Sequence, residues 1–448
     1  MRTPYILLLG LIIILSSCKQ DDDGYEPQVS DLDLELEALL LEQSQDGTLG
    51  FYILPDSDDY SNIPQDPMNP ITAAKVRLGQ LLVHETATGG NPKMKENEGM
   101  FACASCHPVA AGFFSGARQG IGEGGSGFGT FGEARVMMPS SEMPEDSVDI
   151  LPIKVPTLLN VAYQEVALWN GSLGGSGINA PFAEQNAEDF PDNLRGMQGL
   201  EVQGMVGQDA HRLKIDTEFV EKFGYKELFD AAFPDLEPEQ RYSRETGGMA
   251  IASFNRTVLA NRAPWQDWLR GDRNALTEDQ KNGAVLFFSK ARCFECHTGP
   301  ALKSMEFHAF GMDDLGPARA KSFKRVASLG RGDFTGRPED NFKFKVPTLY
   351  NLKNTPFYGH GASFTDIRSV VAYKNRGVPQ QADVPESQLA EQFGNLDLSR
   401  EEIDLITDFI ENGLYDPDLV RYVPESVLSG NCIPNNDPQS RIDLGCED

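Results

Sequence analysis

A motif of two cysteines followed by a histidine occurs twice in this 448-residue chain. Two thiols at this spacing can add to the two vinyl groups of one haem, and the adjacent histidine then lies below the iron as proximal ligand. A zinc half-site or a redox dithiol is the alternative for either copy, but the immediate histidine disfavours both. The motifs therefore predict two covalently bound c-type haems, with His107 and His297 as iron ligands. The copies are Cys103-x-x-Cys106-His107 and Cys293-x-x-Cys296-His297.

Each motif belongs to a longer pattern that repeats along the chain. The sequence Lys-Val-Pro-Thr-Leu-x-Asn follows both cysteine pairs, over residues 154–160 and 345–351. An apolar segment with a central glycine, Gly79 or Gly283, precedes both pairs. A repeat of this length indicates two copies of one haem-binding unit.

The remaining periodicity is helical. Apolar residues recur at helical spacing over residues 219–233, 249–259 and 403–410, and few stretches alternate like strands. Capping-box patterns at Thr277 and Ser399 mark two helix starts. We therefore predict an all-α fold of two tandem cytochrome c-type haem domains with long loops. The domains are expected over 67–265 and 266–424, with a linker at 264–274.

The N-terminal end carries export signals. Residues 1–18 contain Arg2, an apolar run too short to span a bilayer, and small residues before Cys18. This predicts a lipoprotein signal peptide with Cys18 as the lipidated residue, and an ordinary cleaved signal or a short anchor is the alternative. Residues 19–66 are expected to form an acidic tether with one short helix at 32–42. We expect an exported lipoprotein anchored to the outer membrane, on its periplasmic face or at the cell surface.

Seven cysteines are present, and two remain after haem attachment and lipidation are counted. These are Cys432 and Cys446, in a polar tail. An exported chain meets an oxidising compartment, so we expect them to form a disulfide that pins the tail, residues 425–448.

The net charge is −28. Such a charge argues against nucleic acid as a partner, because phosphates would be repelled. It suits the attraction of a basic electron carrier, although a well-solvated acidic surface explains it equally well.

Residues 74–414 resemble the bacterial di-haem cytochrome c peroxidases and the related MauG enzymes. The resemblance implies that the first-half haem reacts with hydrogen peroxide. It also implies that the second-half haem delivers electrons from a small donor protein, a cytochrome c or a cupredoxin. Trp169 corresponds to a tryptophan between the haems, with an ordinary buried tryptophan as the alternative, and Gln203 corresponds to a distal-pocket glutamine. The resemblance rests on both haem motifs, both Pro-Thr-Leu-x-Asn segments, Leu286-Phe287-Phe288, Phe307-His308-x-x-Gly311 and Pro356-Phe-Tyr-x-His360-Gly361.

One departure from the family concerns the sixth ligand of the first haem. Many members close this haem in the resting state with a histidine 16 residues after the proximal one. Glu123 stands at that position here, within a glycine-rich turn. A carboxylate is a poor iron ligand beside imidazole, so we expect an open haem that needs no prior reduction. The alternative is that His84 or His211 closes it.

A second departure concerns the other haem, to which many members supply an axial methionine. Tyr373 lies in the corresponding segment and resembles the axial tyrosine of MauG. A phenolate stabilises ferric iron and lowers its potential. The alternative is a core aromatic, with Met305, Met312 and His308 as rival ligands.

The acid–base catalyst of the family is a glutamate ten residues after the glutamine, where this chain has Leu213. His211 is the substitute we predict for the proton transfers of peroxide cleavage. Arg212 is expected to stabilise the departing hydroxide. The alternative places both on a surface loop.

Many members hold a calcium ion between their domains. One of its ligands is an asparagine two residues before the first Pro-Thr, where this chain has Lys154. An ammonium cannot coordinate calcium. Asn354 still offers an oxygen, so the sequence leaves a calcium site open.

These features together predict a di-haem peroxidase, an oxidoreductase that reduces hydrogen peroxide. Two alternatives stay open: MauG-like oxidation of a partner protein, and a peroxide-inert electron carrier. A structural or sugar-binding surface lipoprotein is disfavoured by the haem motifs.

Overall fold

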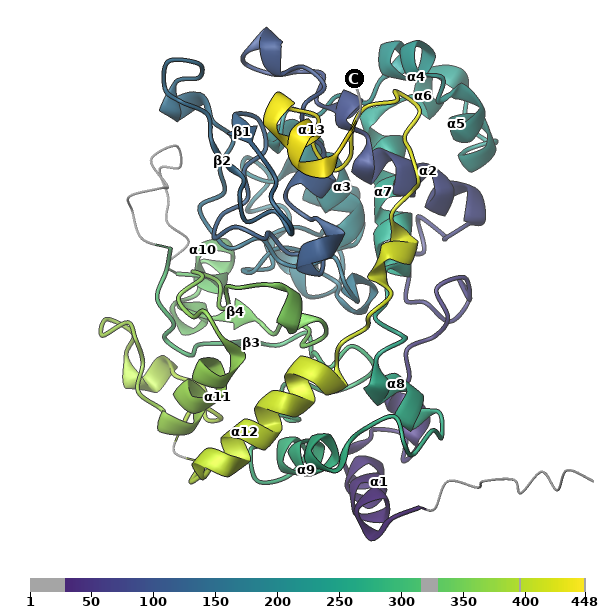
Figure 1. Ribbon diagram of the computed structural model, residues 1–448. Coiled ribbons are helices and arrows are strands. Elements are labelled where there is room, and N and C mark those ends of the chain that lie inside the picture. Colours follow the sequence, from purple (N-terminus) through teal and green to yellow (C-terminus); the bar gives the residue numbers. More distant parts are fainter. Residues whose placement is uncertain (1–28, 316–328, 395, 447–448) are drawn as a thin grey trace, which may run out of the picture.

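A computed structural model describes residues 29–315, 329–394 and 396–446 (Figure 1). The predicted signal peptide and Cys18 lie outside these residues. The described chain is rich in helix and contains two short antiparallel strand pairs, which confirms the helix-rich class. The pairs are β1 (Gly125–Ser126) with β2 (Val136–Met137) and β3 (Phe307–His308) with β4 (Phe344–Lys345).

The helices form two groups. In the first group α2 and α3 both pack against α7, and in the second α9 packs against α12 and α1. The first group is α2 (Ala73–His84), α3 (Gly199–Ala210), α4 (Thr217–Phe223), α5 (Lys226–Ala232), α6 (Pro238–Arg241) and α7 (Arg244–Thr257). The second is α1 (Asp31–Gln43), α8 (Pro264–Leu269), α9 (Glu278–Phe287), α11 (Ile367–Arg376) and α12 (Arg400–Asp408). The short helix α10 (Arg331–Thr335) packs instead against residues 171–190 of the first half, and α13 (Pro438–Leu444) ends the described chain.

The sequence repeat is also a repeat of packing. A Cβ atom added to Gly79 of α2 would lie 2.0 Å from the Ala250 carbonyl oxygen of α7. A Cβ added to Gly283 of α9 would lie 2.1 Å from the Leu405 oxygen of α12. Each glycine thus allows two helix backbones to cross in direct contact, and each lies on the helix that precedes a cysteine motif in the sequence.

One hydrophobic core runs through both groups of helices. Trp265 and Trp268 of α8 are fully buried in it, with stacked rings whose centroids are 5.6 Å apart. Residues 264–274, expected as a linker, therefore begin with a buried helix. Two large apolar side chains on one short helix were enough to draw the segment into the core.

The N-terminal segment also differs from the expected tether. A helix is present at α1, but Leu36 and Leu40 are fully buried. The Asp33 carboxylate forms an ion pair with Lys281 of α9 at 2.6 Å and accepts a hydrogen bond from Trp268 at 2.8 Å. Residues 29–66 are therefore part of the packed body. The residues up to Leu54 lie against the second group of helices, whereas Pro64 accepts a hydrogen bond from Arg256 of α7 at 3.1 Å.

The C-terminal segment leaves the second group of helices after α12 and runs back across the first group (Figure 1). Cys432 and Cys446 form the expected disulfide. Asp437, fully buried, forms an ion pair with Arg135 at 3.1 Å. Burial alone would raise the pKa of Asp437, but hydrogen bonds from Ser440 and the charge of Arg135 hold it below the ordinary value.

This C-terminal segment reaches the first haem motif. The Ser105 hydroxyl, between the two cysteines, donates to the Pro434 carbonyl at 3.1 Å. The Asn436 amide donates to the Met100 carbonyl at 3.0 Å. The two chain ends are therefore exchanged: each packs on the group of helices that is distant from it in sequence.

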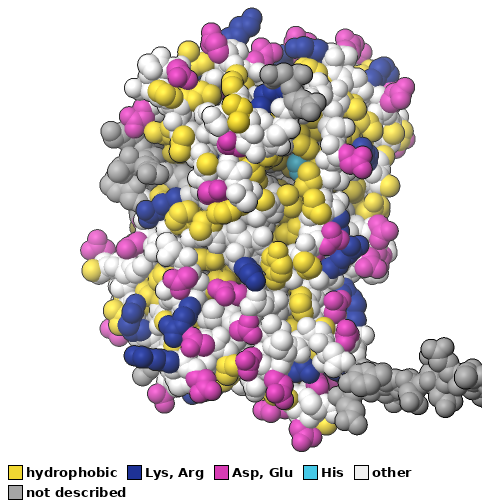
Figure 2. Space-filling view, viewed as in Figure 1, with side chains coloured by type: hydrophobic (Ala, Val, Ile, Leu, Met, Phe, Trp, Pro, Cys, Tyr) yellow, Lys and Arg dark blue, Asp and Glu magenta, His cyan; other side chains and the backbone are white. Residues whose placement is uncertain are grey.

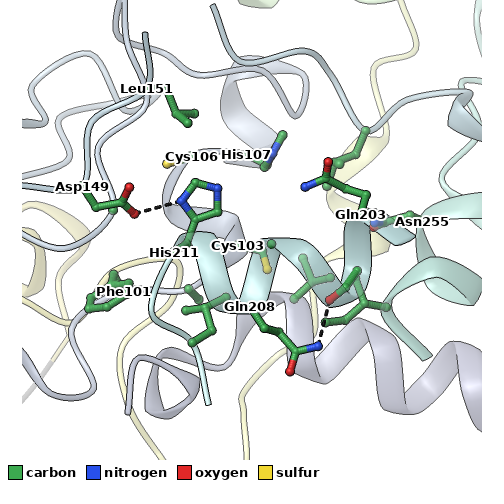
Figure 3. A pocket seen from close by; sticks show the side chains of 18 residues that line it. Phe101, Cys103, Cys106, His107, Asp149, Leu151, Gln203, Gln208, His211 and Asn255 are labelled. Atoms are coloured by element: carbon green, nitrogen blue, oxygen red, sulfur yellow. Dashed lines mark hydrogen bonds and ion pairs between the residues drawn. The ribbon is translucent and has the colours of Figure 1, made fainter. Parts of the chain in front are cut away.

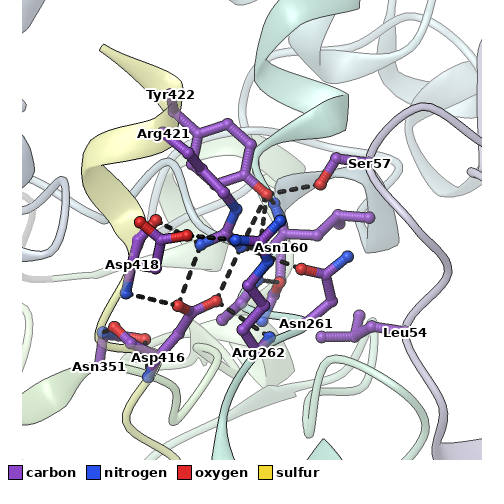
Figure 4. Close-up of polar contacts among 12 residues, drawn as sticks. Leu54, Ser57, Asn160, Asn261, Arg262, Asn351, Asp416, Asp418, Arg421 and Tyr422 are labelled. Carbon is purple, nitrogen blue, oxygen red and sulfur yellow. Dashed lines mark hydrogen bonds and ion pairs between the residues drawn. The ribbon is translucent and has the colours of Figure 1, made fainter.

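A polar network joins the two repeated Pro-Thr-Leu-x-Asn segments (Figure 4). Asn160 and Asn351 both adopt left-handed backbone with φ of 56°. Asn351 donates to the Asp416 carbonyl at 2.8 Å, and Asp416 forms an ion pair with Arg421 at 2.8 Å. Arg421 in turn donates to the Leu259 carbonyl at 2.9 Å. Buried polar groups that satisfy one another in this way fix the position of both segments.

Among the described residues, no helix has the length and apolar character that a bilayer crossing requires. Acidic side chains are spread over all parts of the face shown in Figure 2.

Candidate active site

The first cysteine motif opens onto a cavity of about 90 Å³ (Figure 3). Cys103, Cys106 and His107 all line it. The His107 Nδ1 lies 3.0 Å from the Phe113 carbonyl oxygen, so Nδ1 carries the proton and Nε2 is left free. Burial lowers the pKa of His107 to about 4, which keeps the imidazole neutral, the form that binds a metal.

Helix α3 supplies the facing wall of this cavity. Gln203 points its carboxamide into the space (Figure 3). Its Oε1 is buried and has no hydrogen-bond partner among the described residues. An orphaned buried acceptor of this kind is costly unless a bound molecule satisfies it.

His211, which ends α3, faces the same cavity (Figure 3). Its Nδ1 lies 2.9 Å from the Asp149 carboxylate, which is buried. Burial alone would lower the pKa of His211, but the charge and hydrogen bond of Asp149 raise it above the ordinary 6.5. The carboxylate holds the proton on Nδ1 and leaves Nε2 as the atom available for chemistry.

Sequence reasoning did not find Asp149. It is a single aspartate in a loop, 62 positions before His211, and no local pattern marks it. Only the folded chain brings the two side chains together.

Glu123 does not line the first cavity. It is fully buried and accepts hydrogen bonds from the backbone amides of Lys93 at 3.0 Å and Met94 at 2.9 Å. Burial alone would raise the pKa of Glu123, but these amides and the Arg212 guanidinium hold it below the ordinary value. Its carboxylate is thus fully committed to structural partners.

Arg212 does not lie where we expected it. We expected it to stabilise a departing hydroxide, yet it does not line the cavity. Its guanidinium forms an ion pair with Glu123 and donates to the Ser147 carbonyl at 2.8 Å. Arg212 adopts left-handed backbone, with φ of 57°. His84 is outside the cavity lining too, and its Nδ1 lies 2.8 Å from the Gln80 carbonyl oxygen.

The second cysteine motif opens onto a larger cavity, of about 230 Å³. Cys293, Cys296 and His297 line it. The His297 Nδ1 lies 3.1 Å from the Leu302 carbonyl oxygen, and burial lowers the pKa of His297 to about 4. The proximal arrangement of the first half is therefore repeated in the second.

Tyr373 of α11 lines this second cavity, as do His308 and Met312 but not Met305. The Tyr373 hydroxyl donates to the Phe310 carbonyl at 2.6 Å. Burial raises its pKa above the ordinary 10. Tyr373 and two of its three rivals therefore line the cavity onto which Cys293 and Cys296 open.

Trp169 lines the second cavity and not the first. Its indole Nε1 donates to the Lys154 carbonyl at 2.7 Å, and its ring meets that of His360 edge to face with centroids 6.5 Å apart. Trp169 is thus held between a residue of the first half and a residue of the second.

The residues of both cavities fit a covalently attached haem. Each offers two thiols, a neutral histidine with a free Nε2 and an apolar lining, and the first adds the orphaned Gln203 acceptor. Two such sites in one helical chain are the residue pattern of a di-haem c-type cytochrome.

Comparison with known proteins gives the family. Residues 73–274 match the family model described as di-haem cytochrome c peroxidase. Cytochrome-c peroxidase IdrP1 of Pseudomonas sp. (strain SCT) is 28% identical over 337 residues, which are 70% of this chain and 75% of that protein. Methylamine utilization protein MauG of Methylorubrum extorquens is 27% identical over 321 residues, 70% of this chain and 72% of that protein.

The fold has relatives among solved structures. A MauG-like protein associated with microbial copper homeostasis superposes with a TM-score of 0.54 and 24% identity, over 82% of this chain and 96% of that one. These matches support the di-haem cytochrome c peroxidase and MauG family for this protein, and an oxidoreductase of that type.

Proposed function

We propose that this protein reduces hydrogen peroxide at the haem carried by Cys103, Cys106 and His107. A small redox protein donates the electrons, which reach that haem through the second haem and Trp169. Two electrons and two protons convert one peroxide into two waters. The observation that carries the proposal is the wall opposite His107. Gln203 and His211 face the cavity there, and no other imidazole of the described residues does.

The bound haem supplies the redox chemistry of O–O cleavage, and the chain supplies the proton transfers. His211 Nε2 takes a proton from the incoming peroxide and returns it to the departing oxygen, which leaves as water. Asp149, at 2.9 Å, keeps the other ring nitrogen protonated and stabilises the imidazolium that forms between the two transfers. The Gln203 carboxamide, with a free buried acceptor, orients the peroxide hydroxyl.

We further propose that the first haem is open in the oxidised resting protein. Support comes from Glu123, whose carboxylate is bound to backbone amides and Arg212, and from His84, which lies outside the cavity lining. His211 is the remaining imidazole that could bind the iron from this side.

Low-temperature EPR of the as-purified oxidised protein tests both points. A high-spin ferric signal that disappears on addition of peroxide is the expected result. Two low-spin signals that ignore peroxide would contradict an open, reactive haem. A His211→Gln variant then tests whether His211 binds the iron. If the first haem is low spin in wild type and high spin in this variant, His211 is an iron ligand instead of a base.

MauG-like oxidation of a partner protein is the second candidate function. Tyr373 in the lining of the second cavity favours it, because a phenolate ligand lowers the potential of a haem and eases the loss of electrons. The two functions differ in the source of electrons. Peroxide turnover that needs an added cytochrome or cupredoxin supports the peroxidase, whereas peroxide-dependent oxidation of a protein substrate supports the second.

We also propose that the protein is exported and held at the outer membrane by lipid on Cys18. The sequence of residues 1–18 supports this proposal. Incorporation of labelled palmitate in cells, and its loss in a Cys18→Ser variant, is the test.

A further inference from the structure

The junction between the two halves contains a buried ammonium group. Lys154 follows the first haem motif in sequence, is 1% exposed, and lines the second cavity. Its Nζ donates to the Ser115 carbonyl at 2.7 Å and to the Thr355 hydroxyl at 3.1 Å. Ser115 belongs to the first half and Thr355 to the second, so one amine joins an oxygen from each.

Two aromatic rings complete the surroundings of this amine. The Nζ lies 5.7 Å from the ring centre of Phe114 in the first half and 5.8 Å from that of Phe357 in the second. Ring faces attract a cation and so offset part of the cost of burying it. No ion pair joins Lys154 to a carboxylate in the part of the chain that the structure describes.

The backbone of Lys154 is held at the same junction. Its amide donates to the His360 carbonyl at 2.8 Å, and its own carbonyl accepts the indole N–H of Trp169 at 2.7 Å. His360 and Trp169 both line the second cavity. Displacement of Lys154 would therefore displace Trp169 and the wall of that cavity.

A calcium ion, which the family resemblance implies between the halves, does not fit these residues. Calcium needs six to eight oxygen ligands, and an ammonium already occupies the point at which oxygens of the two halves converge. Asn354, the other candidate ligand, donates its amide to the Ala110 carbonyl at 3.3 Å and accepts from Asn351 at 3.4 Å. Its polar atoms are thus already engaged.

We propose that the Lys154 ammonium is the cation of this junction in place of a metal ion, and that Lys154 is a positioning residue for Trp169 and the second haem. The protein then keeps its junction without calcium. Removal of this charge from the edge of the second cavity favours ferric over ferrous haem and lowers the reduction potential of the second haem. This role of Lys154 is independent of peroxide reduction.

The test compares the haem-loaded full chain with two variants at pH 6. Burial lowers the pKa of Lys154 to about 7, so this pH keeps the amine protonated. Lys154→Met removes the charge and keeps the length of the side chain. Lys75→Met is the matched control, because Lys75 is also buried and donates to two neutral oxygens, those of Asn69 and Pro70, both in the first half.

Wild type should show the same melting temperature in EGTA and in calcium chloride, and no stoichiometric calcium binding by calorimetry. Both variants should melt at lower temperature, but only Lys154→Met should lower the potential of the second haem and alter its EPR signal. One calcium per wild-type chain, bound at micromolar concentration with a rise in melting temperature, would overturn the proposal. So would a second haem whose potential and EPR signal are the same in both variants.

Discussion

Replacement of Asp149 by asparagine isolates the pairing of this carboxylate with His211. The variant keeps the size of the side chain but loses a charge-assisted hydrogen bond of 2.9 Å to the imidazole. Such a bond contributes about 1.5–3 kcal/mol. If it acts on the transition state of peroxide cleavage, kcat/KM for peroxide falls about 10- to 100-fold, since about 1.4 kcal/mol corresponds to one decade.

The pH profile gives a second, independent readout. A general base must be neutral, so kcat/KM in the wild type rises with pH through the His211 pKa, which lies above 6.5. Without the Asp149 charge, burial dominates and lowers that pKa. The midpoint of the rise therefore moves to lower pH in the Asp149→Asn variant.

Stopped-flow measurement of peroxide consumption from pH 5 to 9, with EPR of each resting sample, provides the data. Asp146→Asn is the control, because Asp146 lies three positions away on an exposed turn. The proposed role of the Asp149–His211 hydrogen bond would be refuted if Asp149→Asn kept the rate and pH profile of wild type while His211→Gln was strongly impaired. Full activity in both would remove His211 from the mechanism.

Three further predictions concern stability, measured by urea unfolding of the oxidised protein. Gly283→Ala places a Cβ 2.1 Å from a backbone oxygen of α12 and is expected to cost about 1–3 kcal/mol. Replacement of both Cys432 and Cys446 by serine opens a short loop and costs about 3 kcal/mol. Asp437→Asn leaves the Arg135 charge buried and unpaired, which costs about 3–5 kcal/mol near neutral pH. Because the folded-state pKa of Asp437 is depressed, its contribution is present above about pH 4 and is lost as the pH falls through that pKa.

Each of these variants has a control. A Cβ at Gly394 meets no atom within 4 Å, so Gly394→Ala should leave the unfolding midpoint unchanged. The serine variant should match wild type that has been reduced before unfolding. A difference between wild type and Asp437→Asn that stays constant from pH 7 down to pH 2 would contradict the role of the carboxylate charge.

Local patterns predicted the features that depend on neighbouring residues. The capping boxes at Thr277 and Ser399 begin α9 and α12, as expected from a spacing that the helix itself imposes. The predicted helix over 219–233 is instead two, α4 and α5, because Gly224 has φ of 79° and ends the first. The spacing of apolar residues does not reveal a helix end that depends on one glycine with positive φ.

Features that depend on distant residues could not be read in this way. Asp149 gains its importance from a histidine 62 positions later, and Arg212 loses its expected role to Glu123, 89 positions earlier. The polar composition of residues 19–66 also concealed the apolar stripe of Leu36 and Leu40, which are buried where α1 packs against α9. Tertiary packing decided each of these cases.

Because each chain end packs on the distant group of helices, we do not expect either half of the protein to fold as an isolated fragment. A fragment that ended at residue 265 would keep the first haem motif but lose Pro434 and Asn436, which hold its loop, and the Asp437 partner of Arg135. A fragment that began there would lose α1 from the surface of α9. Contacts between residues some 300 positions apart also form late in folding, since long loops must close first. We therefore expect the two haem sites to fold and unfold as one cooperative unit, and each to be best studied by point substitution in the whole chain.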